Sequence, residues 1–210
     1  GWQQEEQPWV ELVAGDYNLD GRKEAKLANN RLLVLVSPVA GGQIYELDVK
    51  SICHNLLATL ARRPEAYHRK VLEGPTQNGD SVASIHDRVI FKQEGLDERL
   101  GYDAWDRNSL VDHFVASDAS AEQIAAGRAA ELGDFVHGTY EARLRRSDDR
   151  AQLQLTRRGH VSDRPLRITK GITLSASAES SAAAASNMLE IAYLLEEIPT
   201  DITLHFAPEL

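Results

Sequence analysis

The strongest chemical pattern in the sequence is a short loop with an oxygen-bearing group at every second position. These groups are side chains or, at Arg22, the backbone carbonyl: Asp16, Asn18, Asp20, Arg22 and Glu24. Gly21 permits the sharp turn that would bring them together. Ca²⁺ prefers about six to eight oxygen ligands from a tight loop, and this spacing matches the first part of an EF-hand loop. The pattern therefore predicts a calcium site.

A second interpretation of the same loop needs no metal. The twelfth position of an EF-hand loop carries an acid, but Leu27 stands there in this chain. Asp and Asn also form turns by bonding to their own backbone, with carboxylates left in water. The calcium site and the Asx-rich turn both remain open, and in either case the loop leads into a β domain.

A second chemical group lies between residues 101 and 114. It combines aromatic, charged and imidazole side chains, of which the candidate carbohydrate ligands are Tyr102, Asp103, Trp105, Arg107 and His113. Aromatic faces suit the apolar faces of sugar rings, and charged groups suit their hydroxyl rims. The alternative is that Trp105 covers core and that Arg107 pairs with Asp103 or Asp112. This alternative is favoured, because internal ion pairs and aromatic core cover are commoner than ligand sites.

Other catalytic arrangements have less support. His86 precedes Asp87, and His113 follows Asp112, so these residues could form the acid–base pair that a sugar epimerase needs. The only cysteine, Cys53, excludes an internal disulfide and a cysteine zinc site. The sequence has no H-x-x-x-H, no G-x-S-x-G and no glycine-rich phosphate loop.

Composition places the chain among ordinary globular proteins. Its length of 210 residues is enough to bury a sizeable core. Its residues are 42% hydrophobic and 26% charged, as is ordinary for a globular protein. The net charge of −9 argues against a nucleic-acid or anionic-membrane partner. No apolar run approaches about 18 residues, so no membrane span is predicted. The single cysteine is compatible with a reducing compartment, and a cytoplasmic location is expected.

Alternating apolar and polar residues predict several strands, and a continuous apolar run predicts the buried one at 31–36. The expected strands cover residues 9–13, 31–36, 45–49, 140–145, 151–156, 166–176, 189–195 and 202–206. Pro38, Gly41 and Gly42 predict a turn between the second and third of these. A further ordered segment is expected at 85–89, and the Ser/Ala tract 175–186 is expected to be a long hairpin loop.

Helices are predicted to be few and short. Leucines at helical spacing predict a helix over residues 54–63, which Pro64 ends. Ser120 and Gln123 form a capping-box pattern for a helix running toward Leu132. The expected fold class is mainly β, an antiparallel β-sandwich with a few short helices. Residues 1–8 are expected to be a linker or tail and residues 9–210 a single domain.

Several blocks of residues, taken in order, resemble one family of carbohydrate-active enzymes. The blocks are Gly41-Gly42-x-x-Tyr45-Glu46-Leu47-Asp48-x-Lys50, Asn55-Leu56-Leu57, Ala61-Arg62-Arg63-x-Glu65-Ala66-Tyr67-His68, Tyr102-Asp103, Arg107-x-Ser109-Leu110-x-Asp112-His113-Phe114 and Glu131-Leu132-Gly133-Asp134-Phe135. Together they resemble the C-terminal domain of family 57 glycoside hydrolases of the α-amylase and 4-α-glucanotransferase type. The agreement runs from about Asp16 to Asp134 and continues more weakly to Leu210.

The resemblance implies a galactose-mutarotase-like β-sandwich, also called a supersandwich. The family's domain continues past the position of Leu210, so the sandwich is expected to be truncated here. The resemblance also implies a parent enzyme that acts on α-1,4-glucans with a retaining pair of carboxylates in an N-terminal barrel. Because that barrel is not in this sequence, no residue here is expected to be catalytic.

The function expected from the resemblance is accessory. The domain would pack on the N-terminal catalytic barrel, shape one wall of the glucan cleft, and contact an α-glucan or maltooligosaccharide. One alternative is a free-standing aldose mutarotase that uses His86 or His113, although a shared fold does not carry function. The other alternative is a purely structural domain that binds no sugar.

Overall fold

The structure is a computed structural model that describes residues 7–72, 100–125, 127–177 and 188–210. The chain divides into two compact units. The larger unit comprises residues 1–59 and 108–210, and the smaller unit comprises residues 60–107. The described part of the smaller unit contains one short helix, α1 (His68–Leu72), with irregular segments on either side of the gap.

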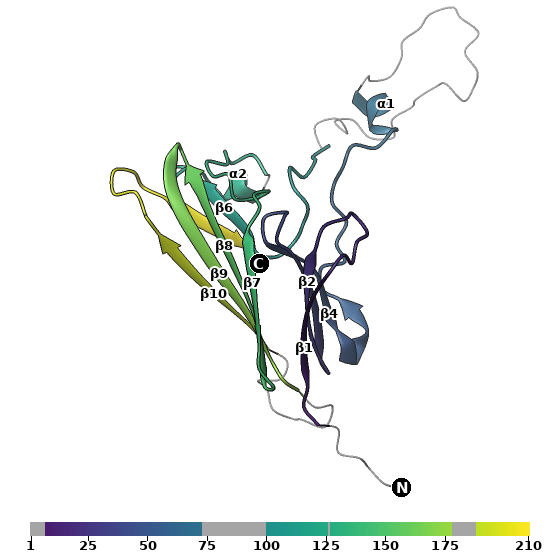
Figure 1. The fold of residues 1–210 in the computed structure, drawn as a ribbon. Helices are drawn as coiled ribbons and strands as arrows, with labels where there is room; N and C mark the ends of the chain where they lie inside the picture. Colours follow the sequence, from purple (N-terminus) through teal and green to yellow (C-terminus); the bar gives the residue numbers. More distant parts are fainter. Residues whose placement is uncertain (1–6, 73–99, 126, 178–187) are drawn as a thin grey trace, which may run out of the picture. The chain divides into compact units, whose positions relative to one another are not determined.

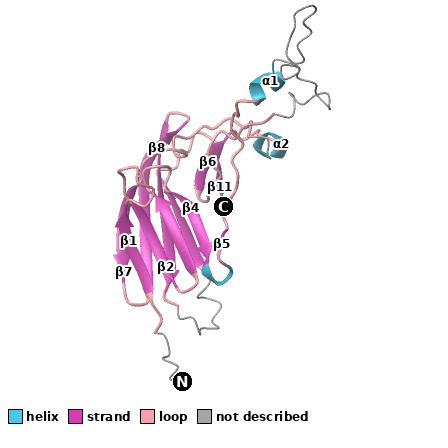
Figure 2. Cartoon of the chain, turned by 90° about the vertical axis from the view of Figure 1, so that its right-hand side faces the viewer, coloured by secondary structure: helices cyan, strands magenta, loops and turns pink. Residues whose placement is uncertain are grey.

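The regular structure of the larger unit consists mainly of antiparallel strands (Figures 1 and 2). The first sheet has the order β1-β2-β3-β4-β5, with strands β1 (Val10–Gly15), β2 (Glu24–Asn29), β3 (Leu32–Ser37), β4 (Gln43–Val49) and β5 (His54–Asn55). A single 3₁₀ turn, η1 (Lys50–Ile52), separates β4 from β5.

The second sheet has the order β10-β9-β8-β7, with strands β7 (Glu141–Arg146), β8 (Arg150–Val161), β9 (Arg164–Ser175) and β10 (Leu189–Glu196). A separate ladder joins β6 (Val111–Val115) to β11 (His205–Glu209). Helix α2 (Ala121–Ala125) follows β6. These antiparallel sheets with few short helices confirm the predicted mainly β fold class.

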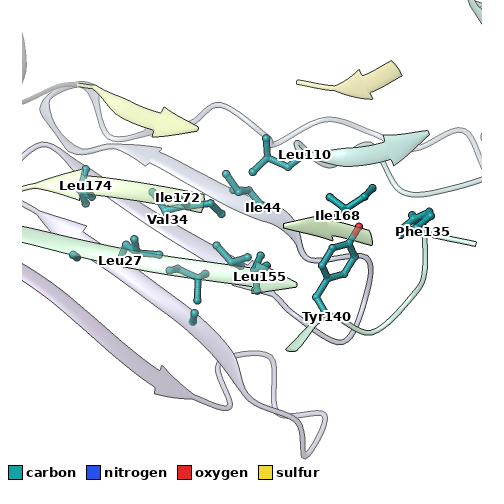
Figure 3. Packing of buried hydrophobic residues seen from close by; sticks show 14 of the residues in the cluster. Leu27, Val34, Ile44, Leu110, Phe135, Tyr140, Leu155, Ile168, Ile172 and Leu174 are labelled. Carbon is teal, nitrogen blue, oxygen red and sulfur yellow. The ribbon is translucent and has the colours of Figure 1, made fainter. Parts of the chain in front are cut away.

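One hydrophobic core joins the sheets of the larger unit (Figure 3). Strands β8 and β9 bury alternate residues, as a sheet with one covered face should. Their core side chains include Leu153, Leu155, Ile168, Ile172 and Leu174, and they share one cluster with Leu27, Val34 and Ile44 of the first sheet. The alternation seen in the sequence therefore does set which face of each strand is buried, as in a sandwich.

The turn between β3 and β4 depends on two glycines. Gly41 and Gly42 have φ angles of 71° and 58°, in the left-handed region that favours glycine. The surroundings leave no room either, because a Cβ at Gly41 would lie 2.1 Å from the carbonyl oxygen of Val136. The predicted turn is confirmed, and it carries the Gly41 carbonyl into the interior.

The helix predicted over residues 54–63 is wrong. The chain instead pairs His54 and Asn55 with β4 and then continues without a helix. The Asn55 side chain accepts hydrogen bonds from the backbone N–H groups of Leu47 and Leu57, at 3.3 and 2.9 Å. An Asn side chain that bonds to nearby backbone competes with helix formation, and this tertiary pairing overrides the leucine spacing.

The capping-box prediction is confirmed at the start of α2. The Ser120 hydroxyl accepts from the Gln123 N–H at 3.2 Å, and the Gln123 side chain accepts from the Ser120 N–H at 2.8 Å. The helix ends at Ala125, earlier than expected.

The strand predicted over 202–206 is shifted to β11 and pairs with β6. The predictions at 85–89 and in most of the 175–186 tract lie outside the described residues. In the described part of the chain, no helix is long and apolar enough to cross a membrane.

Candidate functional site

The acidic loop between β1 and β2 is held together by its own backbone. Both oxygens of Asp16 accept backbone N–H groups, from Asp20 at 3.1 Å and from Gly21 at 3.0 Å. The side-chain oxygen of Asn18 also accepts the Asp20 N–H, and the Asp20 carboxylate accepts the N–H of Arg22 at 2.8 Å. The Asn18 and Asp20 contacts are Asx turns, the geometry of the second interpretation of the loop.

Glu24 differs from the rest of the loop because it is buried. Its Oε2 accepts the Tyr17 N–H at 2.8 Å, whereas its Oε1 has no hydrogen-bond partner among the described residues. The Tyr45 hydroxyl is likewise buried without a partner there. Burial and the nearby Glu24 carboxylate raise the pKa of Tyr45 to about 12. Glu24 therefore brings an under-satisfied negative charge to the base of the loop.

The predicted calcium ligands do not form a ready-made cage. Glu24 lies at the buried end of the loop, while the other predicted ligands, Asp16, Asn18, Asp20 and Arg22, are exposed. Across the described segments, no group of three or more His, Cys, Asp or Glu side chains is arranged to hold a metal ion. The calcium site remains a prediction, whose structural support is the unpartnered oxygen of Glu24.

Asp103 organises the described part of the smaller unit. Its carboxylate accepts hydrogen bonds from the Arg62 side chain at 2.7 and 3.0 Å and from Arg107 at 3.0 and 3.1 Å. It also accepts the backbone N–H of Arg62, while its own N–H donates to the Arg62 carbonyl. The guanidinium groups of Arg107 and Arg62 hold the pKa of Asp103 well below its ordinary value of 3.8.

Asp103 and Arg107 are thus engaged with each other, one of the pairings expected from the sequence. The carboxylate ties residue 62 to residues 103 and 107, so it joins the two segments of the smaller unit that the structure describes. With five donors already on its two oxygens, it has little capacity left for sugar hydroxyls. Its geometry fits a framework role.

Tyr102 belongs to a small group of aromatic rings. Its hydroxyl lies 3.2 Å from Nδ1 of His68, and the rings of Tyr67 and His68 pack edge-on, with centroids 4.3 Å apart. Nδ1 of His68 also accepts the Glu65 N–H at 3.1 Å, so two contacts at this nitrogen and the Tyr67 ring together orient the imidazole. Tyr67 and Tyr102 are 63% and 37% exposed, so their rings are available to a ligand.

The sequence reasoning did not select Tyr67 or His68 as site residues. The available signal was two neighbouring ring-bearing residues just after Pro64. Among the other predicted ligands, Trp105 is half-buried in the smaller unit. His113 belongs to β6 of the larger unit, so the five predicted carbohydrate ligands divide between the two units.

His113 is enclosed by carboxylates. Its Nδ1 lies 2.7 Å from Oε2 of Glu131, and its Nε2 lies 3.5 Å from Oε2 of Glu209. Glu131 in turn accepts the N–H groups of Phe114 and Gly133, both at 2.9 Å. Only 6% of His113 is exposed, so both ring nitrogens face protein and not solvent. His86, its proposed counterpart in an epimerase, lies outside the described residues.

The most buried charges in the structure are those of Asp112 and Lys170. The Lys170 ammonium lies 2.8 Å from Asp112 and also donates to the carbonyls of Gly41 and Leu110, at 2.9 and 2.8 Å. The hydroxyls of Tyr140 and Tyr193 donate to the two Asp112 oxygens. All three ammonium hydrogens and both carboxylate oxygens therefore have partners, as buried charges require.

The partner of Asp112 was missed in the sequence, where Arg107 was considered instead. Lys170 stands at a core-facing position of β9, between Ile168 and Ile172, and that break in the apolar alternation was the available signal. Burial lowers the pKa of Lys170, which Asp112 opposes. Burial and the Asp112 charge raise the pKa values of Tyr140 and Tyr193. Because the side chains of Asp112 and Lys170 have no exposure, the pair holds the sheets together and offers no charged group to solvent.

Comparison with known proteins identifies the relatives of this chain. Residues 16–210 match the family model described as alpha-amylase/4-alpha-glucanotransferase, C-terminal. A 4-alpha-glucanotransferase of Thermococcus kodakarensis is 34% identical over 162 residues, 76% of this chain and 24% of the relative. An alpha-amylase of Pyrococcus abyssi is 32% identical over 159 residues, 75% of this chain and 24% of the relative.

A solved structure agrees with the sequence comparisons. The crystal structure of a 4-alpha-glucanotransferase from Thermococcus litoralis superposes with a TM-score of 0.63 at 29% identity, covering 82% of this chain and 25% of the other. The chain thus spans about a quarter of the length of the relatives it matches. It belongs to the family of C-terminal domains of α-amylases and 4-α-glucanotransferases, as the blocks of its sequence indicate.

Proposed function

We propose that this chain is an accessory, non-catalytic part of an enzyme that acts on α-1,4-glucans. The observation that carries the proposal is the family match over residues 16–210 together with coverage of only about a quarter of each relative. The chain would pack on an N-terminal catalytic barrel and shape a wall of the glucan cleft. An α-glucan or maltooligosaccharide would be its ligand, and its natural location would be the cytoplasm, which fractionation of the source cells would test.

The surface that would contact the glucan is the aromatic group of the smaller unit. Tyr67 and Tyr102 expose ring faces on which sugar rings can stack, and His68 fixes their orientation. Trp105 would extend this surface. Asp103 and Arg107 would act indirectly by holding the backbone that carries Tyr102, since their charges are already paired.

Calorimetric titration of the protein with maltoheptaose tests this proposal. We expect saturable binding, at about millimolar strength, that weakens at least about tenfold in Tyr102→Ala, because stacked rings carry much of the binding in such sites. Tyr17→Ala is the matched control, since Tyr17 and Tyr102 are both 37% exposed and Tyr17 lies in the larger unit.

Two outcomes would contradict the proposal. If the titration curves are the same for wild type, Tyr102→Ala and Trp105→Ala, only a structural role would remain for this surface. Faster anomerisation of fresh α-glucose in the presence of the protein, lost in His113→Asn, would support an epimerase. The enclosure of His113 by Glu131 and Glu209 argues against the second outcome.

We further propose that the acidic loop binds Ca²⁺. An ion near the loop would give Oε1 of Glu24 the partner that it lacks among the described residues. The exposed side chains of Asp16, Asn18 and Asp20, with the Arg22 carbonyl, would supply further oxygens after a modest rearrangement of the Asx turns. The ion's role would be to stabilise the entry to the first sheet, without a part in catalysis.

The calcium proposal predicts a shift in melting temperature. At a Ca²⁺ concentration about 100 times its Kd, the free energy of unfolding should rise by about 2.7 kcal/mol, or about 5–10 °C for a chain of this size. Calorimetry with calcium and with chelator measures the shift. Asp20→Ala should abolish it, while Asp148→Ala, an exposed aspartate in the β7–β8 turn, should keep it. An equal shift in both variants, or none in wild type, would remove the proposal.

A further inference from the structure

The outer face of the second sheet carries a shallow hollow of about 300 Å³. This face is opposite to the core, and its residues follow from the strand register. One row of cross-strand neighbours runs Arg143, Gln154, Gly171 and Ala192, from β7 to β10. The next row begins with Arg145. The hollow is therefore a trough that crosses the strands and has one strongly basic end.

Small residues form the floor of this trough. A Cβ added at Gly171 would meet nothing within 4 Å, so internal packing does not require a glycine there. Glycine within a strand weakens it and often marks a place where a ligand or another backbone approaches closely. Ala192 extends the open floor on the neighbouring strand. Three interstrand steps of about 4.8 Å give the trough a length of about 14 Å.

The two arginines at the basic end differ from most arginines of the central strands. Of the five arginines on β8 and β9, all but Arg150 pair with carboxylates, in the pairs Arg157–Asp134, Arg158–Glu197, Arg164–Asp201 and Arg167–Glu196. Arg143 and Arg145, by contrast, have no hydrogen bond or ion pair within the described residues. They lie two residues apart on one face, about 6.8 Å along the strand, so both guanidinium groups can reach one oxyanion.

The polar part of the lining suits a polyol. Gln152 and Gln154 present amides, and Thr169 and Thr173 present hydroxyls, on both sides of the Gly171 floor. Amides and hydroxyls both donate and accept, as sugar hydroxyls require, and the exposed side chain of Leu194 adds an apolar contact. Tyr193 is the aromatic residue of the lining, but its hydroxyl donates to the buried Asp112, which distinguishes the trough from the stacking surface proposed for a neutral glucan.

We propose that this trough binds a small molecule with an anionic end and a hydroxylated body, of the class of a sugar phosphate. Arg143 and Arg145 hold the phosphate by charge-assisted hydrogen bonds, and the sugar lies over Gly171 between the glutamines and threonines. Charge complementarity selects this ligand class, since the site places two unpaired cations on a protein with a net charge of −9. The site is independent of the glucan surface and does not rest on the proposed function.

Calorimetric titration with glucose 1-phosphate tests the site, with inorganic phosphate, glucose and maltoheptaose as comparison ligands. We expect saturable binding of glucose 1-phosphate, weaker binding of inorganic phosphate, and none of glucose. Binding should weaken as ionic strength rises from about 0.01 to about 0.15 M, because exposed charges are screened. The double variant Arg143→Gln/Arg145→Gln should bind glucose 1-phosphate at least tenfold more weakly.

Two further variants separate the trough from general surface charge. Gly171→Val fills the floor without changing charge, in a position with free space, and should also weaken binding at least tenfold. Arg146→Gln, an exposed arginine of the same strand outside the lining, should leave binding unchanged. Absence of glucose 1-phosphate binding, equal loss in Arg146→Gln, or saturable binding of maltoheptaose that Gly171→Val abolishes would each overturn the proposal.

Discussion

Replacing Asp112 by asparagine is expected to remove about 3–5 kcal/mol of the free energy of unfolding. The amide oxygen still accepts a hydrogen bond from one tyrosine hydroxyl, but the amide NH₂ cannot accept from the other, and the Lys170 ammonium loses the counter-charge that lies 2.8 Å away. A buried charge without its counter-charge is among the costliest defects in a folded protein. Against a total stability of about 5–15 kcal/mol, the variant should melt about 6–20 °C lower. Urea unfolding near neutral pH and calorimetry measure these changes.

An exposed ion pair of the same sheet provides the control. Arg158 lies 2.8 Å from Glu197, at the surface. Arg158→Met should cost at most about 1 kcal/mol, since solvent screens exposed pairs, whereas Lys170→Met should cost several times more. A loss below about 1 kcal/mol in Asp112→Asn would show that the buried pair contributes little and would sink the prediction.

The Asp112→Asn variant should also respond to pH in a defined direction. Burial already lowers the pKa of Lys170 below its ordinary 10.5, and removal of the Asp112 charge lowers it further. Between that lowered pKa and 10.5 the unfolded chain binds more protons than the folded chain, so stability rises with pH. The loss of unfolding free energy in the variant, relative to wild type, should therefore be smaller at a pH of about 9 than at about 7.

In the wild-type protein, strongly alkaline solution should unfold the larger unit. The pKa values of Tyr140 and Tyr193 are raised above their ordinary 10.0, first by burial and then by Asp112. The folded chain keeps both protons where the unfolded chain loses them, so this contribution is complete below pH 10.0 and is lost as pH rises above it. Above pH 10.0, each hydroxyl lowers the free energy of unfolding by about 1.4 kcal/mol for each further pH unit, and the pair lowers it by about 2.7 kcal/mol.

Because the pKa of Lys170 is lowered, this residue makes stability rise with pH up to its ordinary pKa of 10.5. The decline in the free energy of unfolding should therefore become steep only above that pH. Urea midpoints across the alkaline range measure the slope, and tyrosinate absorbance reports whether ionisation accompanies unfolding. Tyr193→Phe removes one of the two protons and should reduce the slope by about half. A midpoint that stays constant to pH of about 12 would contradict the assignment of both hydroxyls to the buried cluster.

Strands β8 and β9 were predictable because one face of each is buried, and the two-residue alternation of burial runs along both, although the charged Lys170 takes a core-facing position. Strands β2 and β6 were not predicted, because nearly all of their residues are buried and no alternation marks them. The segment 54–63 failed because its leucines satisfied helical spacing while Asn55 bonded to the backbone and its neighbours paired with β4. Local spacing competes there with a tertiary pairing that a single sequence does not reveal.

The candidate sites were predictable only in part, because pairing across the chain decides which charges remain available. Arg107 and Asp103 are four residues apart, and their pairing was expected. The meeting of Asp112 with Lys170 joins β6 to β9, and no local pattern predicts it. The trough on the second sheet was equally hidden, since its walls come from residues that read as an ordinary solvated strand face. Arg143 and Arg145 become distinctive only when most arginines of β8 and β9 are seen to be paired and the strand register places both residues beside the hollow.

The ladder between β6 and β11 has a consequence for the order of folding events. It joins segments from the middle and the end of the sequence (Figure 2). Phe206 lies opposite Phe114 and also packs against Tyr193. Contacts so distant along the chain close a long loop before they gain any stabilising energy, so they form slowly. During synthesis Phe114 must wait for Phe206 to emerge from the ribosome. The larger unit therefore completes its core late, and until then the apolar surface around Phe114 is exposed to aggregation.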